Sequence, residues 1–268
     1  MNTQLKVIVR LLVMAAYVLL SANVRAEIVD KYWTPLQDMY YHGKKIEPGP
    51  FIHLTAPRRA DSGAQVPFVF SVDYPMLAEK YIKSVAIYVD QNPVPLAATF
   101  YFNPLSGKAE ISTRIRLESD SLVHVVAQAN DGRLYINAVP IRAEGGCGGT
   151  VDGDEAAAKA SAGKMRLAIE KPLKIGSLNR VKLLIKHPMF TGLQKDLATQ
   201  SFRPAFFINK IEAKYNGKIV MHADTFIGIS EDPNVQFGFI PDKPGKLELT
   251  IKDNEGETFS ASIDVEES

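Results

Sequence analysis

The stretch that decides the fold is ISTRIRLESDSLVHVVAQANDGRLYINAVPI, residues 111–141. Its first part alternates, so that apolar residues fall on one face of a strand while Arg114 and Arg116 fall on the other, solvated face. Two longer apolar runs follow, and Asp131-Gly132 between them is typical of a tight hairpin turn. Consecutive strands with no helix between them predict an antiparallel sheet.

Similar short runs fill the rest of the chain. Further strands are expected at residues 51–54, 66–72, 85–89, 97–102, 181–185, 206–215, 218–222, 235–239, 246–252 and 258–265. Helical spacing of apolar residues predicts one short helix over residues 30–41. We therefore predict an all-β chain of two immunoglobulin-like antiparallel β-sandwich domains, packed against each other and joined by a Gly/Ala-rich linker.

The two halves resemble one another. Residues 81–85 (YIKSV) are similar to residues 207–211 (FINKI), and the turns at Asn130-Asp131-Gly132 and Asn254-Glu255-Gly256 stand at nearly the same offset. Matching offsets predict two copies of one sandwich.

Composition bounds the possible functions. The chain has 268 residues, of which 46% are hydrophobic, and this balance is that of a globular protein. A formal net charge of +1 argues against nucleic-acid binding through bulk electrostatics. The sequence holds a single cysteine, so it forms no intramolecular disulfide.

Residues 1–26 have the pattern of a secretory signal peptide. Lys6 and Arg10 precede an apolar run over residues 11–20, and small residues lead to a cleavage site after Ala26. The run is shorter than the roughly 20 residues of a spanning helix, although a short membrane anchor is the alternative. We expect a periplasmic protein that is free of the membrane once the signal is cleaved.

The single cysteine lies in an unusual segment. Gly-Gly-Cys-Gly-Gly at residues 145–149 is followed by a stretch to Lys164 that is rich in Ala, Gly and Asp. Glycine-rich segments without large apolar residues lack anchors, so we expect residues 145–163 to be an exposed, mobile arm. Within this arm Gly145, Gly146, Gly148 and Gly149 leave the backbone around the thiol of Cys147 without side-chain bulk and free to adopt conformations closed to other residues. The alternative is a flexible linker with an incidental cysteine.

Other chemistry finds less support. The five histidines form no His-x-x-x-His pattern, and no Cys-x-x-Cys pattern exists, so a zinc site is not expected. A glycine-flanked thiol suits the fixed geometry of a Cys–His enzyme poorly. Turn and strand roles are favoured over a role as soft copper ligands at His187, Met189, Met221 and His222. We therefore expect no enzymatic activity, no cofactor and no metal.

The same residues carry a family resemblance. The Gly-Gly-Cys-Gly-Gly segment after a β-sandwich resembles the substrate-carrying tail of SoxY, from the bacterial sulfur-oxidation system. The second half resembles SoxZ in Lys182-x-x-x-x-Lys186-His187-Pro188-Met189-x-Thr191-Gly192-x-x-Lys195-Asp196, Pro204-Ala205-x-Phe207-Ile208, Asn216-Gly217-Lys218 and Lys252-Asp253-Asn254-x-Gly256. The whole resembles fused SoxYZ-like carriers associated with quinoprotein dehydrogenase systems.

The resemblance implies a carrier whose Cys147 holds a sulfur substrate covalently, as in thiosulfate oxidation. Its implied partners are periplasmic redox or sulfur-transfer enzymes, with c-type cytochrome or quinoprotein dehydrogenase systems as candidates. The expected divisions are a signal peptide (1–26), a SoxY-like sandwich (27–144), the carrier arm and linker (145–164) and a SoxZ-like sandwich (165–268).

Two features depart from the family. The pentapeptide, normally at a free C-terminus, is internal here, so the arm is a tethered loop with restricted reach. Arg10 stands alone where SoxY precursors usually carry twin arginines. Both leave the identity of the cargo open. A non-catalytic two-domain interaction module, with Cys147 incidental or paired with another chain, is the alternative function.

Overall fold

A computed structural model describes residues 32–266, and the predicted signal peptide lies outside them. The chain divides into two compact units, one ending at Lys45 and the other beginning at Ile46. In the first unit a helix spans the described residues 32–41, which confirms the helix expected there. Within the described part of the chain, no helix is long and apolar enough to span a bilayer.

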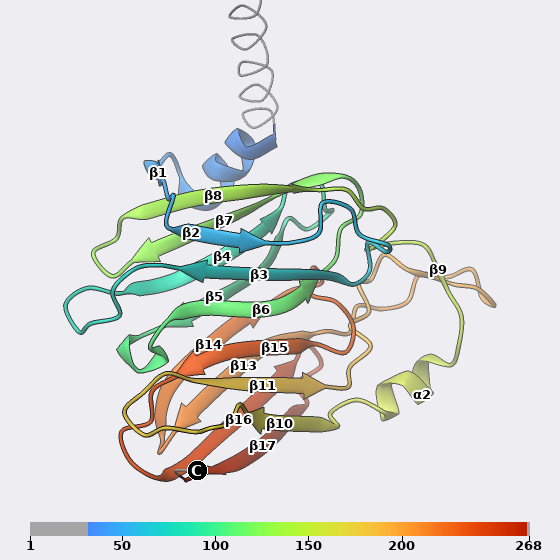
Figure 1. Ribbon diagram of the computed structural model, residues 1–268. Helices are drawn as coiled ribbons and strands as arrows, with labels where there is room; N and C mark the ends of the chain where they lie inside the picture. Colours follow the sequence, from blue (N-terminus) through green and yellow to red (C-terminus); the bar gives the residue numbers. More distant parts are fainter. Residues whose placement is uncertain (1–31, 267–268) are drawn as a thin grey trace, which may run out of the picture. The chain divides into compact units, whose positions relative to one another are not determined.

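The second unit is a sandwich of two sheets (Figure 1). The larger sheet contains, in spatial order, β1 (Ile46–Pro48), β8 (Leu134–Ile141), β7 (Ser121–Ala129), β4 (Ile82–Val89), β5 (Leu96–Phe102), β14 (Lys218–Thr225), β13 (Ile208–Tyr215), β16 (Gly245–Asp253) and β17 (Thr258–Val265). The smaller sheet contains β10 (Met165–Ile169), β11 (Asn179–Ile185), β15 (Asn234–Phe239), β6 (Ala109–Ile115), β3 (Val66–Val72) and β2 (Ile52–Thr55).

The two halves meet edge to edge. In the larger sheet β5 pairs with β14 in antiparallel register, and in the smaller sheet β6 pairs with β15 in the same way. The first-half and second-half strands therefore share continuous sheets, as the colours of Figure 1 show. Two antiparallel β-sandwich halves are confirmed, and joining their sheets satisfies edges that would otherwise be open to aggregation.

The strand order reveals the internal repeat. Outward from the β5–β14 pair, the first half runs β5, β4, β7, β8 and the second half runs β14, β13, β16, β17. Outward from the β6–β15 pair, β3 and β2 correspond to β11 and β10. The two halves thus have the same strand order, as the matching sequence offsets predict.

One buried core runs through both halves. Its fully buried aromatic residues include Phe70 and Phe100 from the first half and Phe239 from the second. The rings of Phe70 and Phe100 lie 5.9 Å apart, one on each sheet of the first half. Every second side chain along β3 and β6 is buried, so one face of each strand lies on the core, as expected for a sandwich strand.

The segment between the halves is more regular than the sequence suggests. It contains β9 (Thr150–Val151), which pairs in parallel with β12 (Lys195–Asp196), and α2 (Glu155–Ala160). Asp154 caps α2, because its side chain accepts hydrogen bonds from Ala156 N and Ala157 N. The segment that the sequence predicts to be an exposed, mobile arm therefore contains regular secondary structure at these positions.

Candidate functional site

The Gly-Gly-Cys-Gly-Gly segment contacts both halves and is buried at its centre. Gly146 is buried, and Cys147 is 1% exposed. The expectation that the arm is exposed is therefore wrong for its central residues. We call the surrounding set the cradle, and define it as Gly63, Arg116, Leu117, Glu118, Met189 and Thr191.

The first half binds the backbone of the arm. Gly145 N donates to Glu118 O at 2.9 Å, and Gly146 N donates to Leu117 O at 3.0 Å. The Glu118 carboxylate then accepts from Cys147 N at 2.7 Å and from Gly148 N at 3.1 Å, through the same Oε2 atom. Four successive amides of the arm are thus bound by two consecutive residues.

Arg116 joins the arm to the second half. Its side chain donates from Nη1 to Gly146 O at 3.0 Å, from Nη2 to Met189 O at 3.2 Å and from Nε to Ile229 O at 3.3 Å. The expectation that Arg116 lies on a solvated face is wrong, since the residue is 3% exposed. The reason is that β6 ends at Ile115, so strand alternation no longer governs the next residue.

The second half closes the cradle through the segment that carried the SoxZ resemblance. Thr191 Oγ1 donates to Cys147 O at 2.7 Å. Lys195 N donates to Gly149 O at 2.9 Å, immediately before β9 pairs with β12. Both halves therefore hold the same five-residue segment.

The structure requires glycine for different reasons at different positions of the arm. A Cβ at Gly146 would lie 2.3 Å from Gly63 O and 2.4 Å from Leu117 O, so only glycine fits there. Gly145 and Gly149 have room but adopt φ values of +72° and +94°. At Gly148 a Cβ would make only ordinary contacts, with Glu118 Oε1 at 3.6 Å as the nearest.

The cradle keeps the thiol protonated. Burial raises the pKa of Cys147 to about 12, the Glu118 carboxylate adds to the rise, and Arg116 opposes it. The thiolate is the nucleophilic form of cysteine, so the docked thiol is unreactive at neutral pH. Activation therefore requires the arm to leave the cradle or the surroundings to change.

His187 binds the backbone of Met189, one of the cradle residues. Its Nδ1 accepts from Met189 N at 3.2 Å, and its ring packs 4.3 Å from the ring of Phe206. Burial lowers the pKa of His187 to about 4, so the imidazole is neutral at neutral pH. Nδ1 is the acceptor, which places the proton of the neutral ring on Nε2.

The residues weighed as copper ligands have other contacts. Met189 Sδ accepts from Ile208 N at 3.2 Å, Met221 lies in the core, and His222 stacks on Tyr101 with ring centroids 4.4 Å apart. Across residues 32–266, no cluster of three or more His, Cys, Asp or Glu side chains is arranged to hold a metal ion.

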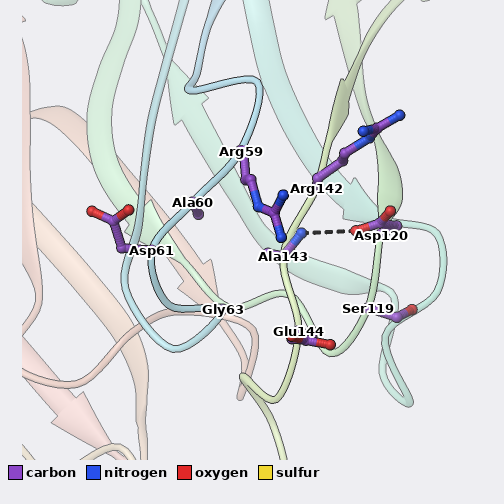
Figure 2. Close-up of a pocket in the computed structure, with 9 residues that line it drawn as sticks. All are labelled: Arg59, Ala60, Asp61, Gly63, Ser119, Asp120, Arg142, Ala143 and Glu144. Atoms are coloured by element: carbon purple, nitrogen blue, oxygen red, sulfur yellow. Dashed lines mark hydrogen bonds between the residues drawn. The ribbon is translucent and has the colours of Figure 1, made fainter.

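A cavity of about 720 Å³ lies at the root of the arm (Figure 2). Asp120 Oδ1 accepts from Ala143 N at 3.0 Å on its wall, which fixes the chain just before the arm begins. Its lining residues are Arg59, Ala60, Asp61, Gly63, Ser119, Asp120, Arg142, Ala143 and Glu144. Gly63 belongs to both the cavity and the cradle, so the two sites adjoin.

Sequence reasoning finds the arm and part of its seat. It singles out Cys147 and its four glycines, and Thr191 stands within the quoted SoxZ-like motif. It misses Glu118, which lies 29 positions before Cys147. No local signal marks this acid, because only the fold brings it to the arm.

Comparison with known proteins defines the class of this site. The family "Sulfur oxidation protein SoxY" matches residues 36–147, and the family "Sulphur oxidation protein SoxZ" matches residues 165–264. The two matches lie in one chain, and residues from both matched regions form the cradle. The sequence and the fold thus define a β-sandwich protein of the sulfur-oxidation class.

The chain belongs to the SoxYZ family, as a fused SoxYZ-like protein. No curated protein matches it. The sulfur carrier protein SoxY from Chlorobium limicola f thiosulfatophilum is 25% identical, with a TM-score of 0.36 over 42% of this chain and 91% of that one. A superoxide reductase (neelaredoxin) from Ignicoccus hospitalis is 16% identical, with a TM-score of 0.32 over 35% of this chain and 80% of that one.

Proposed function

We propose that this protein is a periplasmic covalent carrier that binds a sulfur-containing substrate on Cys147 and presents it to partner enzymes. The observation that carries the proposal is the convergence of both halves on one segment. Arg116 and Glu118 from the SoxY half and Thr191 from the SoxZ half bind the backbone around the sole cysteine. A linker with an incidental cysteine has no need of such a seat.

The cradle supports a role as the resting state of the carrier. In the docked arm the thiol is buried and protonated, which protects it from oxidation between encounters. Loading and delivery then take place after the arm leaves the cradle. The contacts to be broken include the hydrogen bonds of the arm's backbone to Glu118 and Thr191, which local opening of the arm would exchange for bonds to water.

The arm works as a tethered loop. Ala143 is held by Asp120 before the arm, and Thr150–Val151 is held by β12 after it. Arg203, which donates to both Asp196 and Gly153, strengthens the second anchor. Six residues remain between the anchors, and at roughly 3.5 Å per residue they allow an excursion of about 10 Å. A partner enzyme would therefore dock close to the cradle.

The rest of the proposal follows the family. Members of the SoxYZ family work as carriers with sulfur-transfer enzymes and are not catalysts themselves. For this chain we propose periplasmic redox or sulfur-transfer partners, with c-type cytochrome or quinoprotein dehydrogenase systems as candidates. No catalytic residue, cofactor or metal is assigned to it.

The test is complementation of a deletion strain with Cys147→Ser. A hydroxyl cannot form a persulfide or mixed disulfide, so the variant should fail to restore growth on the sulfur substrate. Because Cys147 is buried, Cys147→Ala should be tested beside it, and melting curves of both proteins should show that they fold. Full restoration by folded variants would overturn the carrier proposal in favour of an interaction module.

A further inference from the structure

A negative and a positive side chain lie near Cys147, and they bind different parts of the backbone around it. The carboxylate of Glu118 accepts a hydrogen bond from the amide of Cys147 itself, with Oε2 at 2.7 Å from the amide nitrogen. The guanidinium of Arg116 is directed instead to the carbonyl oxygens of Gly146, Met189 and Ile229. The remaining contacts of the segment with the second half use its carbonyl oxygens, which accept from Thr191 and Lys195.

This arrangement disfavours negative charge on the sulfur. Burial, and after it the charge of Glu118, raises the pKa of Cys147 to about 12 from an ordinary value of 9.0, and the opposing effect of Arg116 is smaller. Each pKa unit is tenfold, so an anionic sulfur is disfavoured in the cradle by about a thousandfold. A thiol escapes this penalty by holding its proton, whereas an adduct with a permanent charge cannot.

We propose that Glu118 sorts the cargo of Cys147 by charge, so that the cradle retains the thiol or a neutral adduct and releases an adduct that carries a permanent negative charge. The inference rests on the proposed carrier function and adds its regulation. Loading with an anionic sulfur group would itself drive the arm out toward a partner, and removal of that group would let it dock again. Glu118 is then the residue that determines which loaded states are presented.

The test attaches charged groups to Cys147 of the purified protein. Methanethiosulfonate reagents transfer an R–S group: the thiol attacks the sulfenyl sulfur, the S–S bond to Cys147 forms, and methanesulfinate leaves with the proton. We would compare a 2-sulfonatoethyl group with a 2-(trimethylammonio)ethyl group, which has similar bulk and opposite charge. Intact mass confirms each label, and hydrogen exchange of residues 145–148 reports docking.

The amides of residues 145–148 should exchange at least about tenfold faster in the sulfonate adduct than in the trimethylammonium adduct. The reason is that the negative sulfonate is repelled by the negative carboxylate of Glu118, whereas the positive trimethylammonium group is attracted to it. In Glu118→Gln the difference should fall to within about threefold, while Glu144→Gln, which removes a nearby acid that does not bind Cys147 N, should keep it. Equal exchange of the two adducts in the wild-type protein would overturn the inference without any variant. So would an undiminished difference in Glu118→Gln.

The attached groups are chemical probes, so this experiment does not depend on cargo in the cell. If complementation by Cys147→Ser succeeds while charge sorting is seen, the carrier function fails and the electrostatics of the cradle stand. If complementation fails as expected and no charge sorting is seen, the carrier function stands and this inference alone fails.

Discussion

Thr191 Oγ1 donates a hydrogen bond of 2.7 Å to the carbonyl oxygen of Cys147, across 44 positions of the sequence. Both residues are buried, one in the SoxZ half and the other at the end of the SoxY half. The bond shows that the SoxZ half contributes directly to the seat of the cysteine. Fusion of the halves fixes this relationship within one chain.

The first prediction separates two neighbouring glycines. Gly146→Ala places a Cβ 2.3 Å from Gly63 O, so the arm should be displaced. Overpacking costs about 1–3 kcal/mol, so the thiol should react with Ellman's reagent at least about fivefold faster. Gly148→Ala meets only ordinary contacts and should react as the wild type does. Equal rates for the two variants would mean that steric fit at Gly146 does not control docking.

The second prediction concerns pH. Burial raises the pKa of docked Cys147 to about 12, so the open form loses its proton first and docking weakens as the pH rises from 9.0 toward 12. Alkylation by iodoacetamide should therefore keep accelerating through about pH 9 to 11 in the wild type. In Gly146→Ala it should level off near the ordinary thiol pKa. A plateau near that ordinary pKa in both proteins would contradict a buried thiol.

The third prediction tests the buried guanidinium. Arg116→Met leaves three carbonyl oxygens without their donor, so the free energy of unfolding should fall by about 2–4 kcal/mol. The control is Arg114→Met, two positions earlier, inside β6 and half-exposed, which should cost about 0.5 kcal/mol or less. Urea unfolding measures both, and equal costs would show that Arg116 does not hold the arm.

The fourth prediction follows from His187. Its folded pKa of about 4 lies below the ordinary 6.5, so the unfolded chain binds the proton first as the pH falls. The contribution of neutral His187 to the free energy of unfolding is then complete above pH 6.5. It falls by about 3 kcal/mol as the pH drops toward 4. His187→Asn should flatten this loss, and His42→Asn, at an exposed site, should not. The same slope in all three proteins would assign the pH dependence elsewhere.

The sandwich is predictable from the sequence because alternation and turn chemistry are local signals. The helix near residue 40 and the Asp131-Gly132 hairpin follow from short-range patterns, and the internal repeat follows from the similarity of the two series of strands and turns. Asp154 before an Ala-rich run is a local signal for α2 that composition masks, because Ala and Gly together suggest a coil.

The docked arm cannot be predicted in the same way. Glycine at position 146 suggests flexibility, whereas the structure needs it because Gly63 and Leu117 approach closely. Arg116 and Glu118 reach the arm only through the return of the chain after β8, and no spacing in the sequence encodes that contact. The sequence identifies the cysteine, and only the fold shows that the cysteine is shielded.

The most direct test of the account is the intact mass of the protein isolated without reductant from the cells that naturally produce it. We predict species heavier than the unmodified protein by the mass of a sulfur-containing group, mapped to Cys147 and removed by dithiothreitol. Protein that is entirely unmodified during growth on the sulfur substrate, or that carries its adducts elsewhere, would contradict the proposed carrier function.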